Sequence, residues 1–179
     1  MTPYRSQGNT LRHSKGHLDI PRLQAANSLV QAMAIFAPVH RLPYMPEEYR
    51  DDVYFAEVYG AFHQALVSYQ ADVAPVYTYE DIARNSREGK LSLLLTLEDG
   101  AVIQGEMGRL EMLKNLGVRI ITLTWNYANC LGAPNSRDPE VMAAGLTDFG
   151  REAVSRMEKL GVIVDVSHLS DGGFWDVVQ

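Results

Sequence analysis

Apolar and polar positions divide the chain into alternating strand and helix patterns. Continuous apolar runs predict four buried strands, which begin at about residues 28, 91, 118 and 162. Between these runs, apolar residues recur at steps of three and four, the spacing of a helix with one buried face. The helices predicted in this way cover 47–71, 106–116 and 147–160. Residues 1–27 are polar and show neither pattern, so an irregular segment is predicted there.

Residues that cap helices support the predicted boundaries. Thr78 precedes a short helical stretch and is followed three positions later by Asp81, which is the pattern of a capping box. Thr147 and Ser170 are predicted to cap two further helices. Glycine supplies the left-handed turn at which many helices end. Such glycines stand at positions 89, 117 and 161.

These elements predict an α/β fold. Strands that are apolar throughout and alternate with helices are typical of a parallel sheet covered on both faces. Such a sheet is either closed into a barrel or open and doubly wound. The glycine-rich phosphate-binding motifs follow none of the strands, which disfavours the nucleotide-binding version of the fold.

Composition and charge exclude several classes of partner. The chain has 179 residues, 46% hydrophobic and 21% charged, as is usual for one globular domain. A net charge of −6 and a pI near 5.3 argue against nucleic acid or an anionic membrane as a partner, since both require clustered Lys and Arg. No run of about 18 apolar residues is present, so no membrane span is predicted. The single cysteine, Cys130, cannot form an internal disulfide, and a cytoplasmic location is expected.

Polar side chains follow three of the predicted strands. Because chemistry in parallel α/β folds takes place beyond the carboxyl ends of the strands, these side chains are candidates for a site. Carboxylate and imidazole are donors that Zn²⁺ accepts, so a Glu and a His at these ends are candidate metal ligands. Residues two apart on a strand share a face, so both would reach the mouth of a barrel. The candidates are Glu98 and Asp99, then Trp125, Asn126 and Asn129, and finally His168.

Each candidate also has a structural explanation. Glu98 could cap a helix or pair with Arg109, and His168 could cap a helix or hold a structural hydrogen bond. A nucleophile pair of Ser167 and His168 is disfavoured, because neighbouring strand residues point to opposite faces. Cys130 lies in a loop rich in Gly, Asn and Pro, without the electropositive surroundings that a reactive thiol needs, so a structural role is favoured.

Several segments, taken in order, resemble one known family. The resemblance is to the renal-type, or membrane, dipeptidases of peptidase family M19, and it runs from about His17 to Gln179. The segments that carry it are HLDIPRL, AIFAP, LTLEDG, LGVRIITLTWNYAN, GLTDFGREAVSRMEKLGVIVDVSHLSD and FWDV.

The resemblance implies a (β/α)8 TIM barrel of the metallo-dependent hydrolase type, with two zinc ions at its mouth. It implies the hydrolysis of dipeptides, including those with a D-residue at the C-terminal position. Glu98 matches the carboxylate that bridges the two metals, and His168 matches an imidazole that binds one of them. A metal-bridging hydroxide would attack the peptide carbonyl, because the metals lower the pKa of bound water. Asp165 would accept a hydrogen bond from the other ring nitrogen of His168.

Trp125 and Asn126 are assigned to substrate binding by the same resemblance. Many members of the family have a His at the position of Trp125, where it is thought to contact the substrate or stabilise the tetrahedral intermediate. Trp can shape a pocket and donate one N–H, but it cannot accept a proton or bind metal. This departure puts the intermediate-stabilising role in doubt.

Other residues of the family pattern are missing. The family's first two ligands form a His-x-Asp motif tens of residues before the segment that 17–23 resembles, and a further His, an Arg and an Asp are expected beyond residue 179. His17-Leu18-Asp19 has the right spelling, but no apolar strand leads into it, so a ligand role is disfavoured. Residues 1–179 are therefore expected to be a single incomplete barrel domain.

Three functions remain open. The first is a zinc-dependent dipeptidase acting on small dipeptides. The second is a non-catalytic truncated remnant or assembly subunit of such a barrel, and the third is a metal-free α/β hydrolase or lyase with Glu98 as general base. Open sheet edges seek partners, so a homo-oligomer is also expected.

Overall fold

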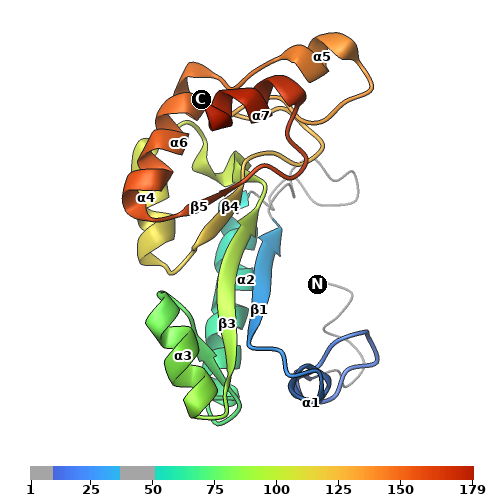
Figure 1. The fold of residues 1–179 in the computed structure, drawn as a ribbon, viewed down its shortest axis with the longest axis vertical. Coiled ribbons are helices and arrows are strands. Elements are labelled where there is room, and N and C mark those ends of the chain that lie inside the picture. Colours follow the sequence, from blue (N-terminus) through green and yellow to red (C-terminus); the bar gives the residue numbers. More distant parts are fainter. Residues whose placement is uncertain (1–9, 37–50) are drawn as a thin grey trace. The chain divides into compact units, whose positions relative to one another are not determined.

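The computed structural model describes residues 10–36 and 51–179. Helices and strands alternate through this part of the chain (Figure 1). In chain order they are α1 (Ile20–Ala25), β1 (Val30–Phe36), α2 (Asp51–Ser68), β2 (Val73–Pro75), α3 (Tyr79–Arg87), β3 (Leu91–Glu98), the 3-10 helix η2 (Gly100–Ile103), α4 (Met107–Asn115), β4 (Ile120–Thr122), α5 (Pro139–Ala143), α6 (Asp148–Leu160), β5 (Ile163–Asp165) and α7 (Asp171–Val178).

Parallel pairing brings the ends of three strands level with one another. The strand order is β1-β3-β4-β5, and β2 also pairs with β3. The pairs β2–β3, β3–β4 and β4–β5 are all parallel, which confirms the predicted fold class. In this register Glu98 lies beside Thr122, and Thr122 lies beside Asp165. The carboxyl ends of β3, β4 and β5 therefore share one edge of the sheet, the edge at which α/β folds bind ligands.

The chain divides into two compact units, each built from separate stretches of sequence. The first unit contains residues 1–33 and 61–94, and the second contains residues 34–60 and 95–179. The ends of β3, β4 and β5 all belong to the second unit. The candidate site residues at these strand ends therefore lie in one unit.

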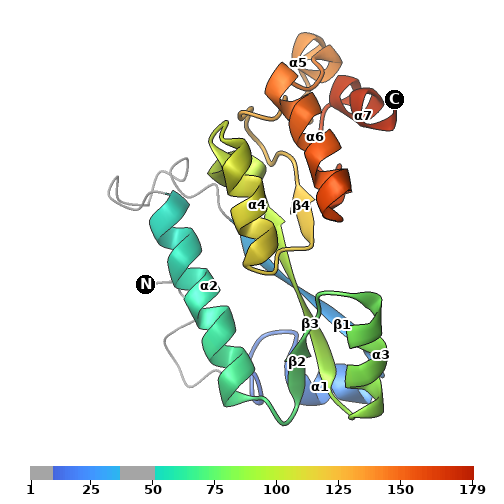
Figure 2. The same ribbon diagram turned by 90° about the vertical axis from the view of Figure 1, so that its left-hand side faces the viewer.

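Apolar side chains of α4 and α6 form the core of the second unit together with the strands. The two helices lie side by side (Figure 1 and Figure 2). Leu110 and Leu113 of α4 and Met157 of α6 are fully buried, as are Leu97 of β3 and Ile121 of β4. Burying each such side chain contributes about 1.5–3 kcal/mol to stability, which fixes the strand ends on a rigid base.

The predicted helix caps at Thr147 and Ser170 are confirmed. The Thr147 hydroxyl accepts a 2.8 Å hydrogen bond from the Gly150 amide at the start of α6. The Ser170 hydroxyl accepts a 3.1 Å hydrogen bond from the Gly173 amide at the start of α7. Gly161 ends α6 with a left-handed backbone, φ 66°, as its position in the sequence predicted.

The first unit contains the predicted capping box. Asp81 Oδ2 accepts hydrogen bonds from the amides of Tyr77 and Thr78, at 2.8 and 2.9 Å, at the start of α3. The buried Asn85 of α3 donates to the carbonyl of Pro75 in β2 and to the hydroxyl of Ser92 in β3, at 3.2 and 3.1 Å. These bonds join a helix to two paired strands within the unit.

The sequence prediction was wrong about two parts of the first unit. Residues 1–27 were predicted to be irregular, but α1 occupies Ile20–Ala25. This helix is too short to show a period, and its signals are Asp19 at the N-cap and Pro21 in the first turn. Four strands were predicted, but the described residues also contain β2, Val73–Pro75. This strand was missed because three residues are too few to show an apolar run. The short η2 and α5 were missed for the same reason.

Several predicted boundaries extend beyond what the structure forms or describes. The strand predicted from residue 118 is observed only at Ile120–Thr122, and the one from residue 162 only at Ile163–Asp165. The predicted helix 47–71 corresponds to α2, and its residues 47–50 lie outside the described part of the chain. The same holds for the last two residues of the strand predicted over 28–38.

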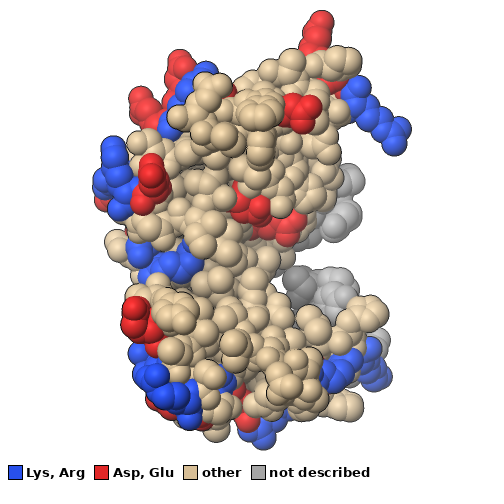
Figure 3. Space-filling model, viewed as in Figure 1, with Lys and Arg blue, Asp and Glu red and all other residues tan. Residues whose placement is uncertain are grey.

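Charged side chains of both signs are mixed on the surface. On the face drawn in Figure 3, Lys and Arg lie among Asp and Glu, and neither sign forms a continuous field. A nucleic-acid surface would require clustered cations. Within the described residues, no helix combines the length and the apolar character needed to cross a membrane.

Candidate functional site

Glu98 and His168 lie next to each other at the strand ends of the second unit. Glu98 is the last residue of β3, and His168 lies in the turn that follows β5. Glu98 Oε1 and His168 Nε2 are 3.8 Å apart, and both side chains are partly exposed, at 35% and 42%. A carboxylate and an imidazole from different strand ends therefore face a common point that solvent can reach.

The spacing of this pair leaves room for one shared metal ion. Two metal–ligand bonds of about 2.0–2.1 Å can join atoms up to about 4.1 Å apart, so one ion fits between Oε1 and Nε2. In residues 10–36 and 51–179, no group of three or more His, Cys, Asp or Glu side chains is placed to hold a metal. As metal ligands, the two side chains would account for only two of the three or four protein ligands that a zinc site requires.

His168 reaches this position through a backbone turn rather than through strand alternation. The strand ends at Asp165, and His168 has a left-handed backbone with φ 64°. The prediction from strand parity was therefore wrong in its reasoning, because parity applies only while the strand continues. The carbonyl of His168 accepts hydrogen bonds from the Thr124 hydroxyl at 3.1 Å and from the Asn135 amide at 2.7 Å. These two bonds hold the turn.

Asp165 is held by neighbouring strand and turn residues. Its Oδ2 accepts a 2.5 Å hydrogen bond from the Thr122 hydroxyl, and its Oδ1 accepts a 3.0 Å bond from the Ser167 amide. Burial works to raise the pKa of Asp165, but these hydrogen bonds and the nearby His168 outweigh it and hold the pKa below its ordinary value. Asp165 is thus an anion that braces the turn carrying His168.

Glu98 makes neither of the two structural contacts that the sequence suggested for it, a helix cap or a pair with Arg109. The cap of η2 is Asp99, whose side chain accepts a 2.9 Å hydrogen bond from the Ala101 amide. Arg109 pairs with Asp52 at 2.7 Å and donates to the carbonyl of Val102 at 3.1 Å. Neither the capping role nor the Arg109 pair is therefore taken by Glu98.

Trp125 belongs to a group of aromatic side chains in the second unit. Its ring meets Phe36 edge to face, with centroids 4.8 Å apart and an interplanar angle of 85°. It also lies 6.0 Å from the ring of Tyr127. Trp125 is half-buried, and the adjacent Asn126 is exposed. The segment after β4 therefore places a half-buried aromatic side chain next to an exposed amide.

The His-x-Asp spelling at residues 17–19 serves a helix cap. Asp19 Oδ1 accepts a 2.9 Å bond from the Arg22 amide, and Oδ2 accepts a 2.8 Å bond from the Arg22 side chain. The Ser14 amide also points at Oδ2, at 3.4 Å. The Arg22 side chain is the main reason why the pKa of Asp19 is lowered to about 2. With both oxygens engaged, Asp19 does not fit a metal ligand.

Cys130 lies in surroundings that suppress thiol reactivity. The side chain is partly buried, and burial raises the pKa of the thiol above its ordinary value of 9.0. The thiolate is the reactive form, so a raised pKa opposes a nucleophilic role. The structure therefore agrees with the structural role predicted for Cys130.

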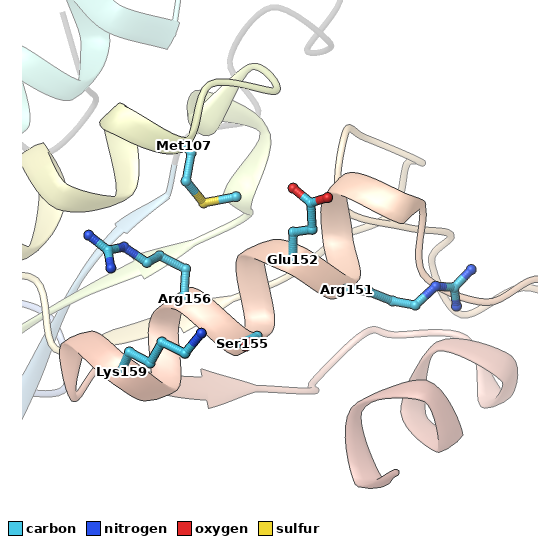
Figure 4. Close-up of a pocket in the computed structure, with 6 residues that line it drawn as sticks. All are labelled: Met107, Arg151, Glu152, Ser155, Arg156 and Lys159. Carbon is cyan, nitrogen blue, oxygen red and sulfur yellow. The ribbon is translucent and has the colours of Figure 1, made fainter.

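A surface hollow of the second unit lies away from these groups. It is formed by residues of α6 and by Met107 of α4, and Figure 4 shows Arg151 directed away from Arg156. Arg151 pairs with Asp176, and Arg156 pairs with Glu111. The hollow contains none of the candidate residues from the strand ends, and its two arginines are already neutralised. Its lining residues are Met107, Arg151, Glu152, Ser155, Arg156 and Lys159.

Comparisons with known proteins match almost the whole chain. The family model described as membrane dipeptidase, peptidase family M19, matches residues 2–179. An uncharacterised protein in the PQQ-III 3' region of Acinetobacter calcoaceticus is 26% identical over 183 residues, covering 92% of this chain and 57% of that protein. The chain thus spans little more than half the length of this relative.

Solved structures give the same picture of the fold. The probable dipeptidase PvdM from Pseudomonas aeruginosa matches with a TM-score of 0.79 and 22% identity, covering 94% of this chain and 47% of that one. A metallopeptidase from Rhodobacter sphaeroides, liganded with a phosphinate mimic of the dipeptide L-Ala-D-Ala, matches with a TM-score of 0.77 and 21% identity, covering 97% and 57%. These likenesses confirm the predicted fold class, α/β and part of a TIM barrel.

Proposed function

The chain belongs to the membrane dipeptidase family, peptidase family M19, and we propose that it contributes Glu98 and His168 to the metal site of a zinc-dependent dipeptidase. The observation that carries the proposal is the 3.8 Å approach of Glu98 Oε1 to His168 Nε2. Two residues 70 positions apart in sequence meet at the edge of the sheet where α/β folds bind ligands. Their donor atoms are the types that zinc accepts.

Glu98 would bridge two zinc ions, and His168 Nε2 would bind one of them. When bound, the ions would lower the pKa of a water molecule and polarise the peptide carbonyl. The partial exposure of both side chains leaves room for a substrate to approach. The Thr124 and Asn135 hydrogen bonds to His168 hold the backbone that carries the imidazole, so little ordering would be required when metal binds.

Trp125 and Asn126 would contact the dipeptide. The half-buried indole packs against Phe36 and presents one N–H donor, while the exposed amide of Asn126 offers both a donor and an acceptor. A dipeptide carries a free amine and a free carboxylate a few bonds from the peptide group. An amide next to an aromatic wall can orient such a molecule, and no side-chain proton transfer is required of Trp125.

The substrates proposed are dipeptides, including those with a C-terminal D-residue. The R. sphaeroides metallopeptidase carries a mimic of L-Ala-D-Ala, which makes this dipeptide a natural first compound to assay. L-Ala-L-Ala is the matched comparison, because it differs only in the configuration of the second residue. With the full set of metal ligands present, hydrolysis of both in the presence of zinc, and of neither after chelation, is the expected result.

The experiment combines zinc titration with assays of site variants. Zinc is added to the metal-free chain while the imidazole signals of His168 are followed by NMR. Zinc should perturb these signals in the wild type, and Glu98→Gln and His168→Asn should weaken zinc binding by more than about 100-fold. The matched controls are Glu140→Gln and His17→Asn, both at exposed positions outside the site.

Three results would separate the proposal from the other functions. Zinc bound below about one tenth of an equivalent, with no change in the His168 signals, would contradict a metal site. Dipeptide hydrolysis that survives chelation would instead favour a metal-free hydrolase with Glu98 as base. Zinc binding without hydrolysis of any dipeptide would favour the non-catalytic alternative.

A further inference from the structure

Asn129, in the loop after β4, joins the side chain of Asp99 to the backbone at Leu123 and Leu131. Its Nδ2 donates to Asp99 Oδ1 and to the carbonyl of Leu123, both at 2.8 Å. Its Oδ1 accepts a 2.8 Å bond from the Leu131 amide. Both N–H groups and the oxygen of the amide are therefore in use. Aspartate has the same shape but no donor, and it would place a second carboxylate against Asp99.

Asp99 sets the backbone that follows Glu98. It has φ 75°, in a region that side-chain-bearing residues rarely occupy, and its side chain is almost fully buried. Its Oδ1 accepts hydrogen bonds from the Ala101 amide and from Asn129 Nδ2. A conformation of this kind persists only when the surroundings hold it. Asn129 is one of the groups that do so.

The same loop also holds the turn that carries His168. Thr124, at its start, donates through its hydroxyl to the His168 carbonyl at 3.1 Å. Asn135, further along the loop, donates through its backbone N–H to the same carbonyl at 2.7 Å. His168 also has a left-handed backbone, with φ 64°. Both unusual backbone positions at the site are thus tied to the single segment 123–135.

We propose that Asn129 is a positioning residue: by bonding Asp99 to the loop that also holds His168, it fixes the separation of Glu98 and His168. The bonds of Asn129 reach the neighbour of Glu98 on one side and the segment 123–131 on the other. The fit against this segment is close, because a Cβ on Gly100 would lie 2.4 Å from a Leu131 methyl group. The proposal rests on the proposed function only in taking the pair to bind zinc.

The test compares Asn129→Asp with a matched variant elsewhere. Asn85→Asp is the control, because Asn85 is a buried amide that donates two hydrogen bonds in the first unit. The first readout is the NMR spectrum of the His168 ring in metal-free chain, and the second is zinc affinity measured by titration. Asn129→Asp should shift the ring signals and weaken zinc binding by about 10- to 100-fold. Asn85→Asp should lower stability while leaving both readouts unchanged.

Exchanging the residues at positions 99 and 129 should restore the position of His168. In the double variant Asp99→Asn with Asn129→Asp, the amide is at position 99 and the carboxylate at position 129, so one N–H···O bond between them can form again. The His168 signals should then return toward those of the wild type. If Asn129→Asp does not fold, Asn129→Ala takes its place, because it removes the same hydrogen bonds without placing a second carboxylate against Asp99. Shifted ring signals in that variant support the proposal, and unchanged signals overturn it.

The outcomes distinguish this proposal from the proposed function. If Asn129→Asp lowers stability but leaves the His168 signals and the zinc affinity unchanged, the residue is merely structural and the proposal is overturned. If the wild type binds no zinc but Asn129→Asp still shifts the ring signals, the proposed function fails and the positioning role stands.

Discussion

The hydroxyl of Thr122 donates a 2.5 Å hydrogen bond to Oδ2 of Asp165, its neighbour on the adjacent parallel strand. The side chains at the ends of β4 and β5 are therefore joined in addition to the backbone ladder. Asp165 Oδ1 in turn accepts from the Ser167 amide, one residue before His168. The support of His168 thus continues into the sheet.

Replacing Thr122 by Val should weaken this support with little change in volume. Val cannot donate, so Asp165 loses one hydrogen bond to a charged oxygen, and the free energy of unfolding should fall by about 1–3 kcal/mol. Urea denaturation at neutral pH measures the loss. Asp165→Asn combined with Thr122→Val should cost less than the sum of the two single changes, because both remove the same bond. Additive losses would contradict a direct interaction.

Acid should release the cap of α1. The Arg22 side chain, followed by the Arg22 amide, lowers the pKa of Asp19 to about 2 from 3.8. A lowered pKa in the folded chain means that the carboxylate stabilises this structure above about pH 4, and that the stabilisation is lost as the pH falls toward 2. NMR titration of the Asp19 carboxyl should show this midpoint, and Arg22→Gln should raise it. Arg12→Gln, which removes a different ion pair, with Asp72, should leave the midpoint unchanged.

A methyl group at position 150 should be costly, while one at position 108 should be favourable. A Cβ on Gly150 in α6 would lie 1.9 Å from the carbonyl oxygen of Leu131, which is backbone and cannot move aside cheaply. Gly150→Ala should therefore destabilise the chain by at least about 1–3 kcal/mol. Gly108 in α4 has no neighbour within 4 Å of such a Cβ, so Gly108→Ala should stabilise by about 0.5–1 kcal/mol. Equal effects of the two changes on thermal unfolding would refute this packing argument.

Cys130 should react slowly with thiol reagents. Burial raises the pKa of its thiol, so less thiolate is present near pH 8 than in an exposed cysteine. The reaction with DTNB should be slower in the native chain than in urea, and the difference should narrow as the pH rises. A native rate equal to the rate in urea would show that the thiol is freely accessible.

The long helices and the apolar strands could be predicted because each buries a repeating face. Of the predicted stripe of Leu110, Leu113 and Leu116, the first two are fully buried in α4 and Leu116 is half-buried at the C-cap of the helix. By contrast β2 has only three residues and α1 only six, which is too short for a period to emerge. The signal for α1 is local, the cap at Asp19, whereas β2 depends on pairing with Leu91, which lies further along the chain.

The candidate site was predictable in its residue types but not in its geometry. Strand ends pointed to Glu98 and His168, and the structure brings the two side chains together. The route to His168 could not be predicted, because its left-handed backbone depends on bonds from Thr124 and Asn135 that only the folded loop creates. The three bonds of Asn129 were hidden for the same reason. In the sequence, nothing distinguishes a loop asparagine that makes structural hydrogen bonds from one whose side chain is solvated.

The interleaving of the two units has a consequence for the order of events during synthesis. Residues 34–60 belong to the second unit, but the rest of that unit begins only at residue 95. The first unit likewise requires residues 61–94 to complete what residues 1–33 begin. As the chain leaves the ribosome, neither unit can be completed before β3 is synthesised, because β3 contributes residues to both units. The synthesis of β3 is thus the step on which the completion of both units depends.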